Sequence, residues 1–78
     1  MRQKKPTLII TFATTTQAMA MEKLCHDCSL PGRLIPVPRE ITAGCGLSWK
    51  AQPQDKELLL DAMAAAEMKW MECHILEI

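Results

Sequence analysis

Two hydrophobic periodicities alternate along this chain of 78 residues. Short stretches rich in β-branched, aromatic and other large apolar residues predict four strands, at residues 7–13, 33–37, 47–52 and 70–78. Two longer stretches repeat hydrophobic residues every three or four positions and predict helices at residues 15–28 and 56–68. The predicted order of elements is therefore β-α-β-β-α-β.

The residues at the ends of these elements support the assignment. Thr14 and Gln17 have the spacing of a capping box at the start of the first helix. Asp55 is the expected N-cap of the second helix. Pro36 and Pro38 cannot donate backbone hydrogen bonds, so the second strand should lie at an edge of the sheet. The first strand is apolar on both faces and should be central.

This order of elements is typical of the ferredoxin-like plait, an α+β fold. Two helices would lie on one face of a four-stranded antiparallel sheet. Right-handed crossovers then predict the strand order 4-1-3-2. The length predicts a single domain over residues 1–78, and residues 1–6 are expected to form a flexible N-terminus.

Charge and cysteine content limit the classes of function. Nine basic and nine acidic residues give a formal net charge of zero, which argues against a nucleic-acid or membrane partner bound through a basic patch. Neither a signal peptide nor an apolar stretch long enough to cross a bilayer is seen, so we expect a cytoplasmic protein with reduced cysteines. So short a chain buries a modest share of its surface, which makes a homodimer or a partner protein plausible.

Cys45 is the first candidate for chemistry. It lies between Gly44 and Gly46, which leave its sulfur uncrowded. Arg33 and Arg39 are near it in sequence, and a nearby cation favours the reactive thiolate over the thiol. The alternative is an unreactive thiol in a glycine turn.

The predicted topology gives Cys45 a second possible source of stabilisation. The first two strands would run in the same direction, so the Cys45 loop would lie near the start of the first helix. Thr14, Thr15 and Thr16 offer unpaired backbone N–H groups and the positive end of the helix dipole there. These groups could stabilise a thiolate or bind a small anion.

Cys25 and Cys28 form a C-x-x-C pair, which in other contexts binds metal or performs redox chemistry. The pair falls at the C-terminal end of the first predicted helix, whereas reactive pairs use a helix N-terminus. Zinc would need two further ligands, and no second close pair is present. We therefore expect no metal site, with Cys25 and Cys73 in the core and Cys28 partly exposed.

Residues 33–47, which contain a Pro-Arg-Glu-Ile…Cys-Gly motif, resemble a family of small bacterial domains described as selenium/sulfur carrier-like proteins. The start of the chain, Ile9-Ile10-Thr11-Phe12 and the threonines after it, is similar to the same family. The resemblance implies that Cys45 carries sulfur or selenium as a persulfide or its selenium analogue, without a cofactor. It also implies a carrier protein rather than a stand-alone enzyme, with cysteine desulfurases or selenium-metabolism proteins as partners.

Two other functions stay open at this point. A small zinc- or copper-handling module would use Cys25 and Cys28. A dimeric domain that binds a small ligand or a protein without catalysis would need neither cysteine, and the fold alone does not exclude it.

Overall fold

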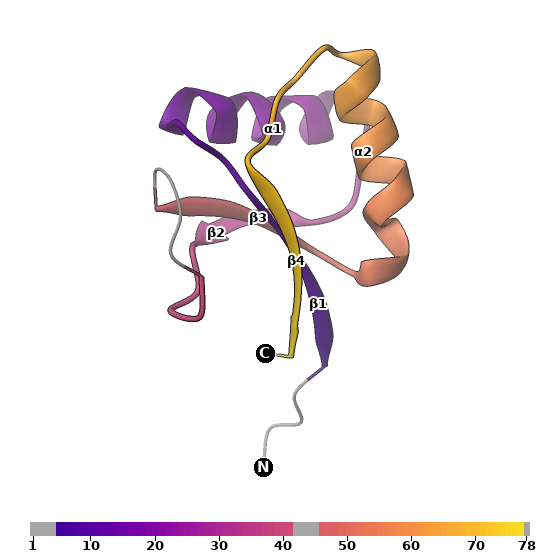
Figure 1. Cartoon of the computed structure of the whole chain (residues 1–78). Helices are drawn as coiled ribbons and strands as arrows, with labels where there is room; N and C mark the ends of the chain where they lie inside the picture. The colour runs from indigo at the N-terminus through magenta and orange to yellow at the C-terminus, as the bar shows by residue number, and fades with distance from the viewer. Residues whose placement is uncertain (1–4, 42–45, 78) are drawn as a thin grey trace.

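The computed structural model describes residues 5–41 and 46–77. Its elements are, in chain order, β1 (Pro6–Thr11), α1 (Thr15–Asp27), β2 (Arg33–Pro36), β3 (Leu47–Ala51), a short 3-10 turn η1 (Pro53–Asp55), α2 (Lys56–Ala65) and β4 (Glu72–Glu77). The strands form one antiparallel sheet in the order β2-β3-β1-β4, which is the predicted order read from the other edge. Both helices lie on the same side of the sheet (Figure 1). The α+β ferredoxin-like plait is thus confirmed, with β2 at an edge and β1 inside.

Most element boundaries agree with the prediction within two residues, and the differences have local causes. Pro6, expected to belong to the N-terminal segment before the first strand, is the first residue of β1 and pairs with Glu77 of β4. Helix α2 ends at Ala65 and not near Met68. β4 begins at Glu72, two residues later than expected.

Both helices end in the same motif without the glycine that usually marks it. After α2, Glu67 adopts a left-handed conformation with φ of 57°, and the N–H of Met68 donates to the carbonyl of Met63 at 2.8 Å. After α1, Ser29 has φ of 54° and the N–H of Leu30 donates to the carbonyl of Cys25 at 2.8 Å. These are Schellman closures, which are difficult to recognise in a sequence when the left-handed residue is not glycine.

The predicted Thr14 cap of α1 is present, with the Gln17 side chain bonded to the N–H of Ala13 in place of Thr14, and the cap of α2 is present only in part. The N–H of Gln17 donates to the Thr14 hydroxyl oxygen at 3.2 Å, and the Gln17 side-chain oxygen accepts from the N–H of Ala13 at 3.0 Å. Asp55 does precede α2, but its side chain makes no capping hydrogen bond. The chain enters α2 through the turn η1 instead.

The main core lies between the sheet and the two helices. Its buried members come from β1, β3, the two helices and the turn after β1: Leu8, Ile10, Phe12, Ala18, Met21, Cys25, Trp49, Ala51, Leu59 and Met63. Burial of each large apolar side chain contributes about 1.5–3 kcal/mol. The prediction that Trp49 and Ala51 share one face of their strand is confirmed.

The face of the sheet away from the helices is also partly buried. Thr7, Ile9, Thr11 and Ser48 on this face are all at most 7% exposed. Their hydroxyls are satisfied, since each bonds a backbone carbonyl and Thr11 also accepts from the N–H of Glu72 at 3.0 Å. β1 is therefore buried on both faces, as its apolar sequence predicts.

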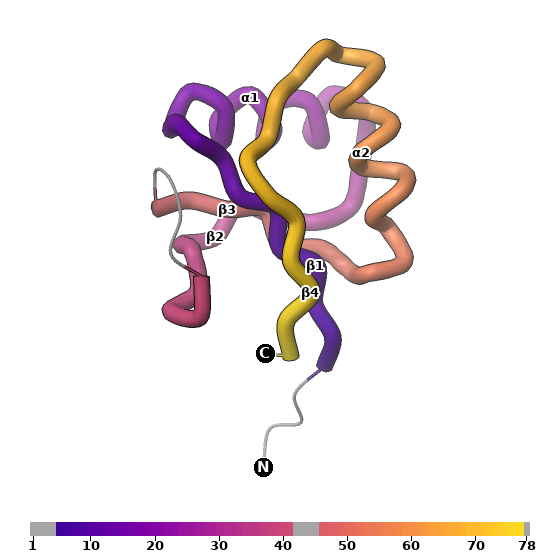
Figure 2. Tube along the Cα trace, viewed as in Figure 1, coloured from indigo at the N-terminus to yellow at the C-terminus, as the bar shows by residue number. Residues whose placement is uncertain are grey.

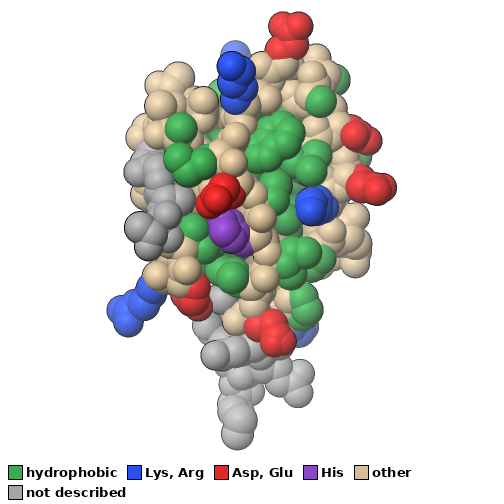
Figure 3. All heavy atoms as spheres, in the orientation of Figure 1, with side chains coloured by type: hydrophobic (Ala, Val, Ile, Leu, Met, Phe, Trp, Pro, Cys, Tyr) green, Lys and Arg blue, Asp and Glu red, His purple; other side chains and the backbone are tan. Residues whose placement is uncertain are grey.

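β4 forms the second edge of the sheet and runs beside β1 (Figure 2). Three large apolar residues remain about half exposed here: Leu58 of α2, Met71 just before β4, and Ile75 of β4. Figure 3 shows hydrophobic side chains gathered over β4 and α2 on the face in view. Within the described residues, no helix has the length and apolar character needed to cross a membrane.

Candidate functional site

Three parts of the chain meet at one end of the sheet. Thr11, the last residue of β1, is paired with Ser48 near the start of β3, and Pro36, the last residue of β2, is paired with Leu47. Helix α1 begins only a few residues after Thr11, at the same end (Figure 1). The start of β3 therefore lies at the end of the sheet where α1 also starts, in agreement with the predicted topology.

Cys45 and Gly44 lie outside the described residues, and the structure describes the chain on either side of them. Before them, Ile41 is buried and its N–H donates to the Pro38 carbonyl at 3.0 Å. After them, Gly46 is exposed with φ of +85°, and its carbonyl accepts from the N–H of Val37 at 2.9 Å. Gly46, which follows Cys45 in sequence, is thus held by a hydrogen bond to the residue after β2, in a backbone conformation that favours glycine.

The N-terminus of α1 has the features expected of an anion-stabilising helix start. Thr14 is the N-cap, and its hydroxyl is used to accept from Gln17. Thr15 and Thr16 are exposed in the first turn, which contains no acidic residue. Early N–H groups of a helix have no partner within the helix, and they carry the positive end of its dipole. The start of α1 therefore contributes partial positive charge from the backbone at this end of the sheet.

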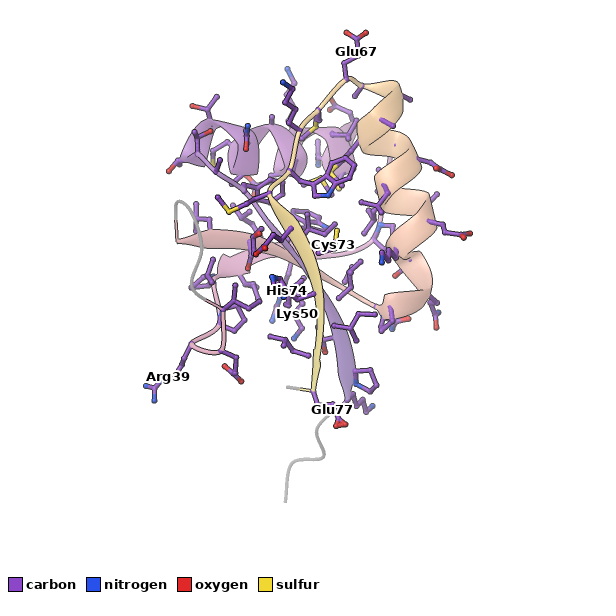
Figure 4. The ribbon with its side chains drawn as sticks, viewed as in Figure 1. Arg39, Lys50, Glu67, Cys73, His74 and Glu77 are labelled. Atoms are coloured by element: carbon purple, nitrogen blue, oxygen red, sulfur yellow. The ribbon has the colours of Figure 1, made fainter. Side chains whose placement is uncertain are left out.

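The two arginines singled out by the sequence lie in different places. Arg39 lies in the connection between β2 and β3, and its exposed side chain points away from the sheet (Figure 4). It forms no salt bridge with another described residue. Arg33 is the first residue of β2 and is paired with Lys50, three positions from the Pro36–Leu47 pair. Three strand residues span about 10 Å. The sheet thus brings α1 and Gly46 to one end and Arg33 to the other.

Sequence reasoning missed Lys50, the cross-strand neighbour of Arg33. One indication of its position is visible in the sequence: in a strand, Lys50 and Trp49 point to opposite faces of the sheet. The strand register decides which residue faces Arg33, and no local pattern indicates that register.

The C-x-x-C pair lies at the end of α1, as predicted, and its two thiols have different surroundings. Cys25 is 3% exposed and belongs to the core, whereas Cys28 is the exposed C-cap residue. Burial, with a smaller contribution from Cys28, raises the pKa of Cys25 from 9.0 to about 11. Burial also raises the pKa of Cys73, and Lys56 partly opposes that shift. In the part of the chain described, no three His, Cys, Asp or Glu side chains are arranged to hold a metal ion.

These surroundings predict a definite order of thiol reactivity. Iodoacetamide added to the folded protein near neutral pH should modify Cys28 readily and leave Cys25 unmodified, because a thiol with a pKa of about 11 is almost entirely protonated. Peptide mass spectrometry after timed quenching measures both sites in one sample. Equal labelling rates for Cys25 and Cys28 in folded protein would contradict the assignment.

The same pKa shift makes stability depend on alkaline pH. The folded state holds the proton on Cys25 more tightly than the unfolded chain does, so this contribution to stability is complete below pH 9 and declines as pH rises toward 11.

The fold defines a small plait domain. Its sequence has a Gly-Cys-Gly segment directly before β3, an inner strand of the sheet. A family model described as "Putative Se/S carrier protein-like" matches residues 7–75, and the chain belongs to this family. The resemblance noted from the sequence is thereby confirmed. Searches among curated proteins and among solved structures found no match.

Proposed function

We propose that this protein is a carrier that holds sulfur or selenium on Cys45 and passes it between partner proteins. The observation that carries the proposal is the family match over residues 7–75, which includes the Gly-Cys-Gly sequence. The family description names a carrier of selenium or sulfur. Of the four cysteines, Cys45 is the one flanked by two glycines in sequence, whereas Cys25 belongs to the core.

The described surroundings support this role for Cys45. Gly46, its neighbour in sequence, lies at the sheet end where α1 begins, so the backbone N–H groups of residues 14–16 can favour a thiolate or a persulfide anion. Arg39 is exposed in the same connection between strands and would add a cation to the bound cargo or to the partner interface. In this proposal Arg33 contributes less than Arg39 to stabilising the cargo, because Arg33 lies at the start of β2, away from the end of the sheet where Gly46 lies.

The transfer needs no cofactor and no external oxidant. The Cys45 thiolate attacks the terminal sulfur of a donor persulfide, a new S–S bond forms on Cys45, and the donor's S–S bond breaks. The donor cysteine leaves as a thiolate, and the terminal sulfur keeps its hydrogen, so Cys45 ends as a persulfide. An acceptor thiolate reverses these steps. A carrier for this reaction needs an accessible nucleophile and a docking surface rather than a deep pocket, and cysteine desulfurases are the donors we expect.

The test is sulfur loading by a cysteine desulfurase supplied with cysteine. Intact-protein mass spectrometry should show the gain of one sulfur atom in the wild type, and Cys45→Ala should abolish that gain. Cys28→Ala is the matched control, since it removes an exposed thiol from the far end of α1 and should leave loading unchanged. Loading that persists in Cys45→Ala and disappears in Cys28→Ala would refute the proposal and favour chemistry at the C-x-x-C pair.

A further inference from the structure

A hollow of about 700 Å³ lies at the end of the sheet away from Gly46. It is bordered by the starts of β1 and β2 and by the end of β3. Apolar atoms of Pro6, Pro31 and Ala51 contribute to its wall. Its volume is within the range of about 300–1,000 Å³ that is usual for small-molecule sites.

Three cationic side chains line this hollow, namely Lys5, Arg33 and Lys50. The acidic residue in the lining is Asp55, and no salt bridge joins any of these cations to a described carboxylate. Thr7 also lines the hollow, and its hydroxyl donates to the carbonyl of Lys5 at 3.1 Å. The hollow thus has an excess of unpaired positive charge.

The sheet itself brings two of these cations together. Arg33 and Lys50 are directly paired across β2 and β3, so their side chains leave the same face of the sheet as close neighbours. Like charges in this position destabilise a sheet, and an acidic residue at either place would remove the repulsion. The repulsion disappears equally if an anion lies between the two cations.

We propose that this hollow binds a small organic anion with a phosphate group. The guanidinium of Arg33 matches two phosphate oxygens, and the ammonium groups of Lys5 and Lys50 supply the remaining charge. The apolar wall would contact the organic part of the ligand. The hollow has the volume of a small-molecule site, so we expect a small ligand there. The proposal is independent of the carrier function, because the hollow and Gly46 lie at opposite ends of β3.

The direct test is titration of the isotope-labelled full chain with pyrophosphate and, separately, ribose 5-phosphate, followed by amide NMR spectra. We expect saturable chemical-shift changes centred on Lys5, Arg33, Lys50 and Ala51. The fitted affinity should be higher at low salt than at high salt. Shifts that do not saturate, or that centre on the start of α1, would overturn the proposal. So would saturation by a glutamate-rich peptide when neither phosphate compound saturates.

Variants separate this site from general surface charge. Arg33→Gln combined with Lys50→Gln should weaken pyrophosphate binding by about tenfold, because two ion contacts are removed. Lys69→Gln removes an exposed lysine that does not line the hollow, and it should leave the affinity unchanged. Equal weakening by both would show nonspecific attraction and refute the site. The double variant should raise the melting temperature of the ligand-free protein slightly or leave it unchanged, because it removes the repulsion between Arg33 and Lys50. Loss of binding in that variant would therefore not reflect unfolding.

Discussion

Gly32→Ala is expected to lower the free energy of unfolding by about 3 kcal/mol. Gly32 has φ of +108°, which side chains of L-residues rarely adopt. A Cβ at this position would lie 2.5 Å from the carbonyl oxygen of Lys50 and 2.9 Å from Cε2 of Trp49, with Nε1 of the same indole still closer. Trp49 is buried and donates from Nε1 to the Pro31 carbonyl at 3.1 Å, so it has little room to move.

Gly46→Ala is the matched control for this substitution. Gly46 has a positive φ of +85°, but an added Cβ would meet no described atom within 4 Å. Only the backbone strain remains, which should cost about 1–2 kcal/mol. Urea denaturation of both variants measures the difference in their free energies of unfolding. Equal losses would show that only the backbone conformation requires glycine at position 32, and that the close approach of Trp49 does not.

Phe12→Ala should cost about 3–5 kcal/mol, the usual loss for a large aromatic residue in a core. Phe12 is fully buried and lies between the last residue of β1 and the N-cap of α1. A domain of this size has a total stability of about 4–12 kcal/mol, so the variant should lose a quarter or more of it and melt at a clearly lower temperature. Thermal denaturation followed by circular dichroism gives the measurement.

The control for Phe12 is an apolar truncation on the surface of the neighbouring helix. Met19 of α1 is 50% exposed, and Met19→Ala should change stability by no more than about 0.5 kcal/mol. A Phe12→Ala loss as small as that of Met19→Ala would mean that the turn from β1 into α1 repacks around the cavity. The packing described for this end of the sheet would then be wrong.

The order of elements was predictable because each carries its own short-range signal. The Thr14–Gln17 cap and the two prolines near β2 are local features. The structure has α1 capped by Thr14 and β2 at an edge of the sheet, as these features predict. The end of α2 was not predictable in the same way, because Glu67 occupies a left-handed position where glycine is the usual signal. Propensity alone would have extended that helix toward Met68.

The candidate site was predictable only in part. The glycines around Cys45 and the family resemblance are visible in the chain, and the family model confirms the latter. The roles of Cys45, Arg39 and the threonines of α1 stay predictions, since Cys45 and Gly44 lie outside the described residues. The role of Arg33 also stays a prediction; Arg33 lies at the end of β2 opposite to the Pro36–Leu47 pair.

By itself the sequence determined the plait, the caps of α1 and the cysteine between two glycines, because these depend on residues close together in the chain. Only the tertiary structure decided that Arg33 faces Lys50 beside a hollow. Strand register depends on which faces are buried by residues distant in sequence, so it is settled by packing of the whole sheet. That register separates the proposed carrier end of the molecule from the proposed anion site.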